Sequence, residues 1–267
     1  GLKPGRLYVM AGRPGSGKST LALSIAENVA SSGVPVAFFN LEMPRSEMAY
    51  RILSRNLRVP SEKIESGDVT GDQMSKMISA SETLSDLPLH ICDDGLMPIE
   101  RFSVEARKLK RQQNIGLIVI DYLQLMASSS KSDNMVREIT KITTNLKALA
   151  KSLNVPIIAL SQLSRKVEDR ENKRPQLSDL RESGSIEQDA DQVWFIFRAE
   201  YYLQNARVEE GHPDYFDWKE AMDKVRGKAE FIIGKNRGGR VGVVDMAFAG
   251  EFSCFADLDK NHYGNNY

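Results

Sequence analysis

The residues with the clearest chemical potential lie near the start of the chain, where residues 12–19 read GRPGSGKS. This run matches the P-loop pattern, a glycine-rich turn followed by lysine and then by serine or threonine. Glycines allow backbone N–H groups to close around phosphate oxygens, and the N-terminus of the following helix adds positive potential. Lys18 is expected to reach the β- and γ-phosphates, and the Ser19 hydroxyl to hold Mg²⁺. The run therefore predicts a site for a nucleoside triphosphate such as ATP.

The flanking sequence favours a P-loop over a chance glycine turn before a helix. The apolar run Leu7–Ala11 leads in as a buried strand, and a helical pattern of apolar residues follows. Strand, glycine loop and helix is the order that phosphate binding at a helix N-terminus requires. The predicted nucleotide-binding residues are consecutive: Gly12, Arg13, Pro14, Gly15, Ser16, Gly17, Lys18, Ser19 and Thr20.

Asp121 is the second candidate, because it closes the apolar run Leu117–Ile120. A carboxylate at the carboxyl end of a parallel strand lies on the edge of the sheet where ligands bind. There it can hold Mg²⁺ directly or through water. Many strands end in aspartate, but after a P-loop in the same chain the pattern indicates a metal-binding acid. Ser19 and Asp121 are therefore the predicted metal ligands.

Two more polar residues close apolar runs. Glu42 follows Val36–Leu41 and is predicted to activate the attacking water; the alternative is an acid near the N-terminus of a helix. Gln162 closes Pro156–Ser161 and offers one acceptor and two donors near the γ-phosphate. It could report the presence of that phosphate by moving the loop behind it. On residue type alone, a simple polar strand end fits Gln162 equally well.

A basic turn near the C-terminus carries Lys235, Arg237 and Arg240. Its glycines join two apolar runs, which predicts a β-hairpin. One interpretation is a solvated basic turn. The other is an arginine finger, which would stabilise the charge that develops on a transferred phosphoryl group.

Short apolar runs and helical patterns alternate through most of the chain, which predicts βαβ units around a mostly parallel sheet. Strands are predicted at Leu7–Ala11, Pro35–Leu41, Leu89–Cys92, Leu117–Tyr122, Pro156–Leu160, Val193–Phe197, Ala229–Gly234 and Val241–Phe248. Helices are predicted at Ser46–Leu57, Glu100–Lys110 and Val136–Leu153. Residues 127–135, 165–185 and 201–226 fit no core element, and the last of these stretches reads as an insertion with some helix.

Composition limits the class of protein. The 267 residues, 41% of them hydrophobic, fit one large α/β domain or two small ones. Lysine plus arginine and aspartate plus glutamate each total 36, which excludes a wholly basic coat for nucleic acid but not a local basic channel. No apolar stretch is long enough to span a bilayer and no signal peptide is visible. We expect a cytoplasmic protein with no membrane partner.

Five motifs in this order resemble the C-terminal motor domain of the DnaB replicative helicase family: NLEMP at 40–44, DYLQLM at 121–126, SQLSR at 161–165, DLRESGSIEQDAD at 179–191 and KNR at 235–237. The similarity runs from about residue 1 to 258. It implies a RecA-like P-loop NTPase fold of the α/β class, with a mostly parallel twisted sheet flanked by helices and a C-terminal β-hairpin. In that fold, the strand ending at Gln162 lies between the P-loop strand and the strand ending at Asp121.

The resemblance also implies a function. ATP hydrolysis at the subunit interfaces of a hexameric ring would drive translocation on single-stranded DNA and duplex unwinding. The implied roles are phosphate and Mg²⁺ binding for Lys18 and Ser19, water activation for Glu42, metal binding for Asp121, γ-phosphate sensing for Gln162, and an arginine finger at Arg237 with Lys235 as its companion. The last two residues would reach the ATP of a neighbouring subunit.

Arg181, Glu182 and Gly184 match the DNA-contacting loop of the family. Arg181 can pair with a phosphate, and Gly184 lets a backbone N–H approach one closely. Glu182 is expected to orient a neighbouring cation. The resemblance further implies primase and a helicase loader as partners of the full-length protein.

The expected domain organisation is one motor domain at residues 1–258 and a polar, flexible tail at 259–267. We expect the family's N-terminal collar domain, which steadies the ring, to be absent from this chain. A RecA-type recombinase ATPase and a nucleotide-switched assembly module without helicase activity are the alternatives. The basic turn and the 179–191 motif favour the helicase, and the presence of Lys18, Glu42 and Arg237 argues against a non-catalytic module.

Overall fold

A nine-stranded sheet is the central element of the fold. The structure is a computed structural model that describes residues 1–126, 132–180 and 184–258. Nine strands of these residues pair in the order β3-β2-β4-β5-β1-β6-β7-β8-β9. Pairing is parallel from β3 to β6 and antiparallel from β6 to β9. The strands are β1 Leu7–Gly12, β2 Val36–Asn40, β3 Leu89–Cys92, β4 Leu117–Asp121, β5 Ile157–Gln162, β6 Gln192–Phe197, β7 Lys228–Asn236, β8 Gly242–Ala249 and β9 Cys254–Asp257.

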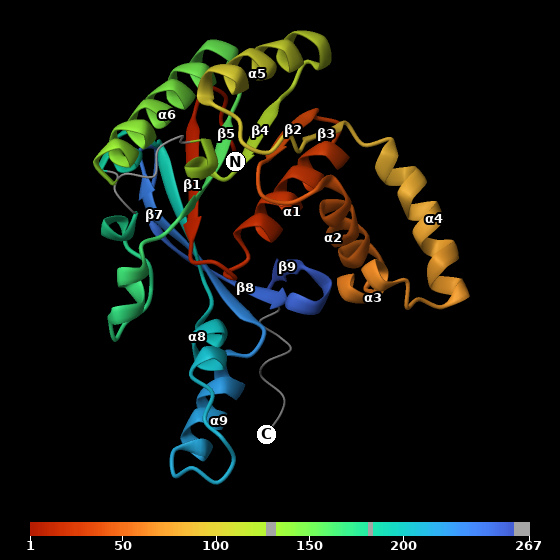
Figure 1. Cartoon of the computed structure of the whole chain (residues 1–267), viewed down its shortest axis with the longest axis vertical. Helices are drawn as coiled ribbons and strands as arrows, with labels where there is room; N and C mark the ends of the chain where they lie inside the picture. The colour runs from red at the N-terminus through yellow and green to blue at the C-terminus, as the bar shows by residue number, and fades with distance from the viewer. Residues whose placement is uncertain (127–131, 181–183, 259–267) are drawn as a thin grey trace.

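Helices cover both faces of this sheet (Figure 1). They are α1 Lys18–Ser31, α2 Arg45–Leu57, α3 Ser61–Ser66, α4 Gly71–Ser85, α5 Ile99–Gln113, α6 Ser132–Leu153, α7 Gly184–Asp189, α8 Ala199–Asn205 and α9 Tyr215–Val225. Short 3₁₀ turns lie at Leu123–Met126, Arg165–Asp169, Leu177–Asp179 and Gly250–Phe252.

Two hydrophobic cores follow from the alternation of side chains along buried strands. Every residue of β1, β2 and β4 is buried. Residues such as Val9 and Ala159 face α5 and α6, whereas Met10 and Leu160 face α1 and α2. The strands are therefore covered on both sides, which is why their sequences are continuous apolar runs.

The structure confirms the predicted fold class and the predicted strand order. β5 lies between β1 and β4, as the resemblance implied. All eight predicted strands are present, and the predicted hairpin is formed by β7 and β8. The prediction missed β9, α3, α4 and α7. In α4 no residue is fully buried. Its apolar side chains Met77, Ala80 and Leu84 are partly buried against Leu53, Val59 and Ile64, so its apolar stripe is a weaker signal than that of a core helix.

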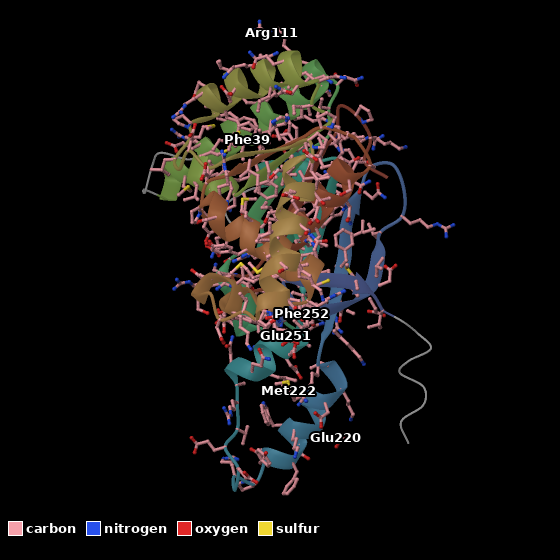
Figure 2. All side chains as sticks on the ribbon, turned by 90° about the vertical axis from the view of Figure 1, so that its right-hand side faces the viewer. Phe39, Arg111, Glu220, Met222, Glu251 and Phe252 are labelled. Atoms are coloured by element: carbon pink, nitrogen blue, oxygen red, sulfur yellow. The ribbon has the colours of Figure 1, made fainter. Side chains whose placement is uncertain are left out.

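The predicted insertion at residues 201–226 forms a helical arm. Helices α8 and α9 extend from the main body in both views (Figures 1 and 2). Met222 is buried within the arm, and the indole N–H of Trp218 donates to Leu203 O at 2.9 Å. Within the described part of the chain, no helix combines the length and the hydropathy needed to cross a membrane.

The α6 face of the sheet gives a test of the packing. Leu146 is fully buried there and Leu96 is 71% exposed. Leu146→Ala is expected to lower the free energy of unfolding by about 2–5 kcal/mol through lost burial and a cavity, and Leu96→Ala by less than about 0.5 kcal/mol. Urea unfolding followed by circular dichroism measures both. Equal losses for the two variants would contradict the described packing.

Candidate active site

The P-loop joins β1 to α1 and is shaped by its glycines. Gly17 has a φ of +95°, and a Cβ there would lie 2.8 Å from Cζ of Phe255. At Gly12 a Cβ would lie 2.4 Å from Oγ of Ser16. Neither position accepts a side chain, so the loop can form a tight backbone cradle at the N-terminus of α1.

Sheet register brings the predicted catalytic residues to one edge. Gly12 pairs with Gln162 across β1 and β5, and Asn40 pairs with Asp121 across β2 and β4. All four residues end parallel strands, so they lie at the carboxyl edge of the sheet, where α/β folds bind ligands. The edge opens into a cavity of about 660 Å³, whose lining includes Lys18, Ser19, Thr20, Glu42, Asp121 and Gln162.

Lys18 lies inside this cavity. Its Nζ donates to Arg13 O at 3.1 Å. Burial lowers the pKa of Lys18 to about 8, although the charges of Asp121 and Glu42 act against that shift. The ammonium is therefore poorly solvated in the free site, and a triphosphate would supply the negative charge that it lacks.

Asp121 is buried at the end of β4. Burial raises its pKa, while a hydrogen bond from the Ser19 side chain and the charge of Lys18 lower it. Its Oδ2 has no hydrogen-bond partner among the described residues. A buried carboxylate oxygen without a partner, beside a serine hydroxyl, is a donor set that suits Mg²⁺. The residues present therefore fit the predicted metal.

Glu42 is exposed at the cavity and held by its neighbour Asn40. Oδ1 of Asn40 accepts from the backbone N–H groups of Glu42 and Met43 at 3.2 and 3.1 Å, and Nδ2 donates to Met43 O at 2.7 Å. This Asx-type turn bends the chain directly after β2. The predictions did not include Asn40, although an asparagine at a strand end is a signal for such a turn.

Gln162 lines the cavity and its backbone contacts Gln124. The amide of Gln124 donates to Oγ of Ser161 at 3.1 Å and to Gln162 O at 3.4 Å, and its Oε1 accepts from Gln162 N at 3.4 Å. Gln124 therefore bridges the turn after β4 to the end of β5. Sequence reasoning placed Gln124 in a motif but gave it no role.

The side chain of Arg13 turns away from the cavity. It lies on the segment after β5, where Nη1 donates to Leu163 O at 2.9 Å and Nε donates to Glu168 at 2.8 Å. The predicted contribution of Arg13 to nucleotide binding is thereby limited to its backbone. The guanidinium instead ties the P-loop to the segment that continues from Gln162.

Arg198, directly after β6, is a site residue that sequence reasoning missed. Its Nη1 donates to Gly15 O at 3.2 Å, and its guanidinium lies 3.8 Å from the ring centroid of Phe248. Phe248 lines the cavity. Arg198 therefore supports both the P-loop and an aromatic wall, through contacts between residues far apart in sequence.

Lys235 and Arg237 lie at the amino edge of the sheet, where the parallel strands begin. β7 is antiparallel to β6, and Asn236 pairs with Gln192, which pairs in turn with Tyr8 at the start of β1. From Tyr8 to Gly12 a strand rises about 13 Å, so the basic turn and the P-loop of one chain are well separated. Burial and the charge of Arg237 lower the pKa of Lys235.

Of the predicted DNA-binding residues, Arg181 and Glu182 lie outside the described residues, as does the predicted tail at 259–267. Gly184 is exposed and begins α7. A Cβ at Gly184 would meet no described atom within 4 Å. Its surface is therefore open to a close approach from outside.

The fold and the site together define a P-loop NTPase fold of the RecA-like type. A family model described as the DnaB-like helicase C terminal domain matches residues 1–257. The chain belongs to this family, which confirms the resemblance read from its motifs.

Similar proteins carry the same family name. The chain is 42% identical over 270 residues to the replicative DNA helicase DnaB of Rickettsia prowazekii, with 97% of this chain and 56% of the relative covered. It is 44% identical over 262 residues to that of Pasteurella multocida, with 97% and 52% covered. The chain therefore spans about half the length of the curated relatives it matches.

Two solved structures resemble the fold. One, described as an ATPase domain, superposes with a TM-score of 0.83 at 34% identity, covering 96% of this chain and 86% of that one. The other, described as a DnaB-like replicative helicase and its interactions with primase, gives 0.83 at 34% identity, covering 97% and 59%.

The lowered pKa of Lys18 predicts how nucleotide affinity changes with pH. Above pH 8 the amine of Lys18 loses its positive charge in the free site, so triphosphate binding requires proton uptake by this amine and Kd rises up to about tenfold per pH unit. Lys18→Arg keeps its charge throughout this range and should lack the dependence. Calorimetry from pH 7 to 10 measures both proteins. A rise of equal steepness in the arginine variant would show that another group titrates.

Proposed function

We propose that this chain is the motor domain of a replicative DNA helicase. ATP hydrolysis at the subunit interfaces of a homohexameric ring drives translocation on single-stranded DNA and unwinds the duplex. The observation that carries the proposal is the separation of the site into two parts. The P-loop, Glu42 and Asp121 share one cavity, whereas Arg237 lies at the opposite edge of the same sheet.

The cavity residues support a division of labour in hydrolysis. Lys18 neutralises the β- and γ-phosphates from inside the P-loop. Glu42 is exposed at the cavity, where it can accept a proton from the attacking water. Ser19 and Asp121 would hold Mg²⁺, which when bound supplies positive charge to the phosphates and leaving oxygens. Gln162, at the end of β5, lines the same cavity and is suited to sense the γ-phosphate.

The basic turn supports a finger that acts between subunits. Arg237 cannot serve its own P-loop across the sheet, but in a head-to-tail ring one edge of a subunit faces the opposite edge of the next. A guanidinium delivered in this way stabilises the charge of the transition state. Lys235, two residues earlier on β7, would add a second charge.

The proposed partners follow from the family and from the neighbours. Single-stranded DNA would be held by Arg181, Glu182 and Gly184. A solved structural relative is described with primase, which supports primase as a partner of the full-length protein, together with a helicase loader. The proposed location is the cytoplasm. The relatives are named replicative helicases, so neither a recombinase nor a non-catalytic assembly module is favoured.

Glu42→Gln tests the proposed base. This variant should bind ATP with near-normal affinity but lower kcat by about 10²–10⁴-fold, because the amide cannot accept the proton. Steady-state ATPase and nucleotide binding are measured in parallel. Glu47→Gln is the matched control, since Glu47 lines the same cavity but is paired with Arg51 at 2.7 Å. The assignment fails if Glu42→Gln turns over like wild type or if the control loses as much.

Mixing two inactive variants tests the finger. Lys18→Ala removes phosphate binding, and Arg237→Ala removes a group worth about 10³–10⁵ in kcat. At equal amounts, random rings contain about a quarter of interfaces in which both groups are intact. ATPase activity should therefore reappear on mixing. With subunit exchange verified by mass, an absence of recovery at every ratio would contradict a finger acting between subunits.

A further inference from the structure

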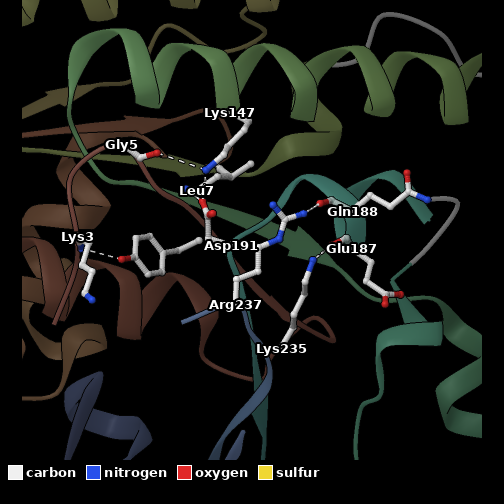
Figure 3. A network of polar contacts seen from close by, with 10 residues as sticks. Lys3, Gly5, Leu7, Lys147, Glu187, Gln188, Asp191, Lys235 and Arg237 are labelled. Carbon is white, nitrogen blue, oxygen red and sulfur yellow. Dashed lines mark hydrogen bonds and ion pairs between the residues drawn. The ribbon is translucent and has the colours of Figure 1, made fainter. Parts of the chain in front are cut away.

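The carboxyl end of α7 holds two of the three cations of the basic turn, Lys235 and Arg237 (Figure 3). Nζ of Lys235 donates to Glu187 O, and Nη2 of Arg237 donates to Gln188 O. The last carbonyls of a helix lack intrahelical partners and carry negative potential, so they suit cations. Arg237 N also donates to Asp191 O at 2.9 Å. Both the backbone and the side chain of Arg237 are therefore set by residues 187–191.

That segment is itself fastened to the body of the domain. Oδ2 of Asp189 accepts from the hydroxyls of Thr143 and Thr144 on α6, at 2.8 and 3.0 Å. Oδ2 of Asp191 pairs with Lys147 of α6 and accepts from Leu7 N at 2.8 Å (Figure 3). Ordered contacts to α6 and β1 thus fix where α7 ends.

In this arrangement the guanidinium of Arg237 has N–H donors left for a further partner. A guanidinium has five N–H donors, and among the described residues the side chain of Arg237 donates a hydrogen bond to Gln188 O alone. The side chain is held at one nitrogen, and the residue as a whole is exposed. A donor group fixed in advance stabilises a transition state without the cost of reorganisation.

We propose that Asp189 is a positioning residue for the arginine finger. By anchoring the end of α7 to Thr143 and Thr144, it fixes the carbonyls that aim Lys235 and Arg237 at the neighbouring subunit. This inference rests on the proposed role of Arg237 between subunits. It also ties the finger to the carboxyl end of α7, a helix that begins three residues after the predicted DNA-binding residue Arg181, so that a shift of α7 moves the finger.

The test is Asp189→Ala, compared with Asp189→Asn in the full-length protein on single-stranded DNA. The alanine variant should lower kcat for ATP by about 10- to 100-fold while KM stays within about twofold, because a finger misplaced by about 1 Å fails in the transition state only. The asparagine variant keeps an acceptor oxygen for the threonines and should recover most of the activity. The double variant Thr143→Val, Thr144→Val removes the same contacts from the other side and should repeat the loss.

A mixing experiment tests whether the loss of activity in Asp189→Ala comes from its arginine finger. Asp189→Ala keeps its P-loop, so adding Lys18→Ala protein, whose finger is intact, should restore ATPase activity. If Asp189→Ala and the threonine double variant show wild-type kcat, or if no activity returns on mixing, the positioning role is wrong. The mixture of Lys18→Ala with Arg237→Ala separates the two failures. If Lys18→Ala with Arg237→Ala recovers activity but Lys18→Ala with Asp189→Ala does not, only the positioning role of Asp189 is wrong. If neither mixture recovers activity, the proposed role of Arg237 between subunits is wrong.

Discussion

Parallel pairing of β1, β5 and β4 is the constraint on which the site depends. It aligns Gly12 with Gln162 and leaves Asp121 at the same edge, next to the Asn40 turn that presents Glu42. These strands are buried on both faces. Because side chains alternate along a strand, a slip of one residue would exchange the two cores, so burial fixes the register and the register fixes the chemistry.

The change from parallel to antiparallel pairing at β6 places other residues at the opposite end of the strands, away from the P-loop. It returns the chain to the amino edge of the sheet and leaves Lys235 and Arg237 there, on the end of α7. Residues that the proposed mechanism needs together are thereby held apart by the fold of a single chain. The antiparallel pairing of β6 and β7 sets this separation, and the ion pair between Lys147 and Asp191 fastens the segment after α7 to α6. It makes assembly part of the proposed active site.

Local patterns predicted the strands and the site residues at their ends. Gly12–Ser19, Asp121 and Gln162 each carry their own signal, a motif or a polar residue closing an apolar run. What the sequence did not reveal depends on contacts between distant residues. The turn of Arg13 toward Glu168, the support of Gly15 by Arg198 and the wall at Phe248 have no local signature. Helix α4 packs only through partly buried side chains such as Met77 and Leu84, so its sequence carries a weaker pattern than a core helix does.

The central claim is that the P-loop is half of a site shared by two subunits. Its most direct test is ATPase activity per chain, measured over a range of protein concentration with mass recorded in the same samples. The account predicts that activity per chain rises together with the oligomer and is nearly absent in the monomer. Constant activity per chain from monomer to ring would contradict it.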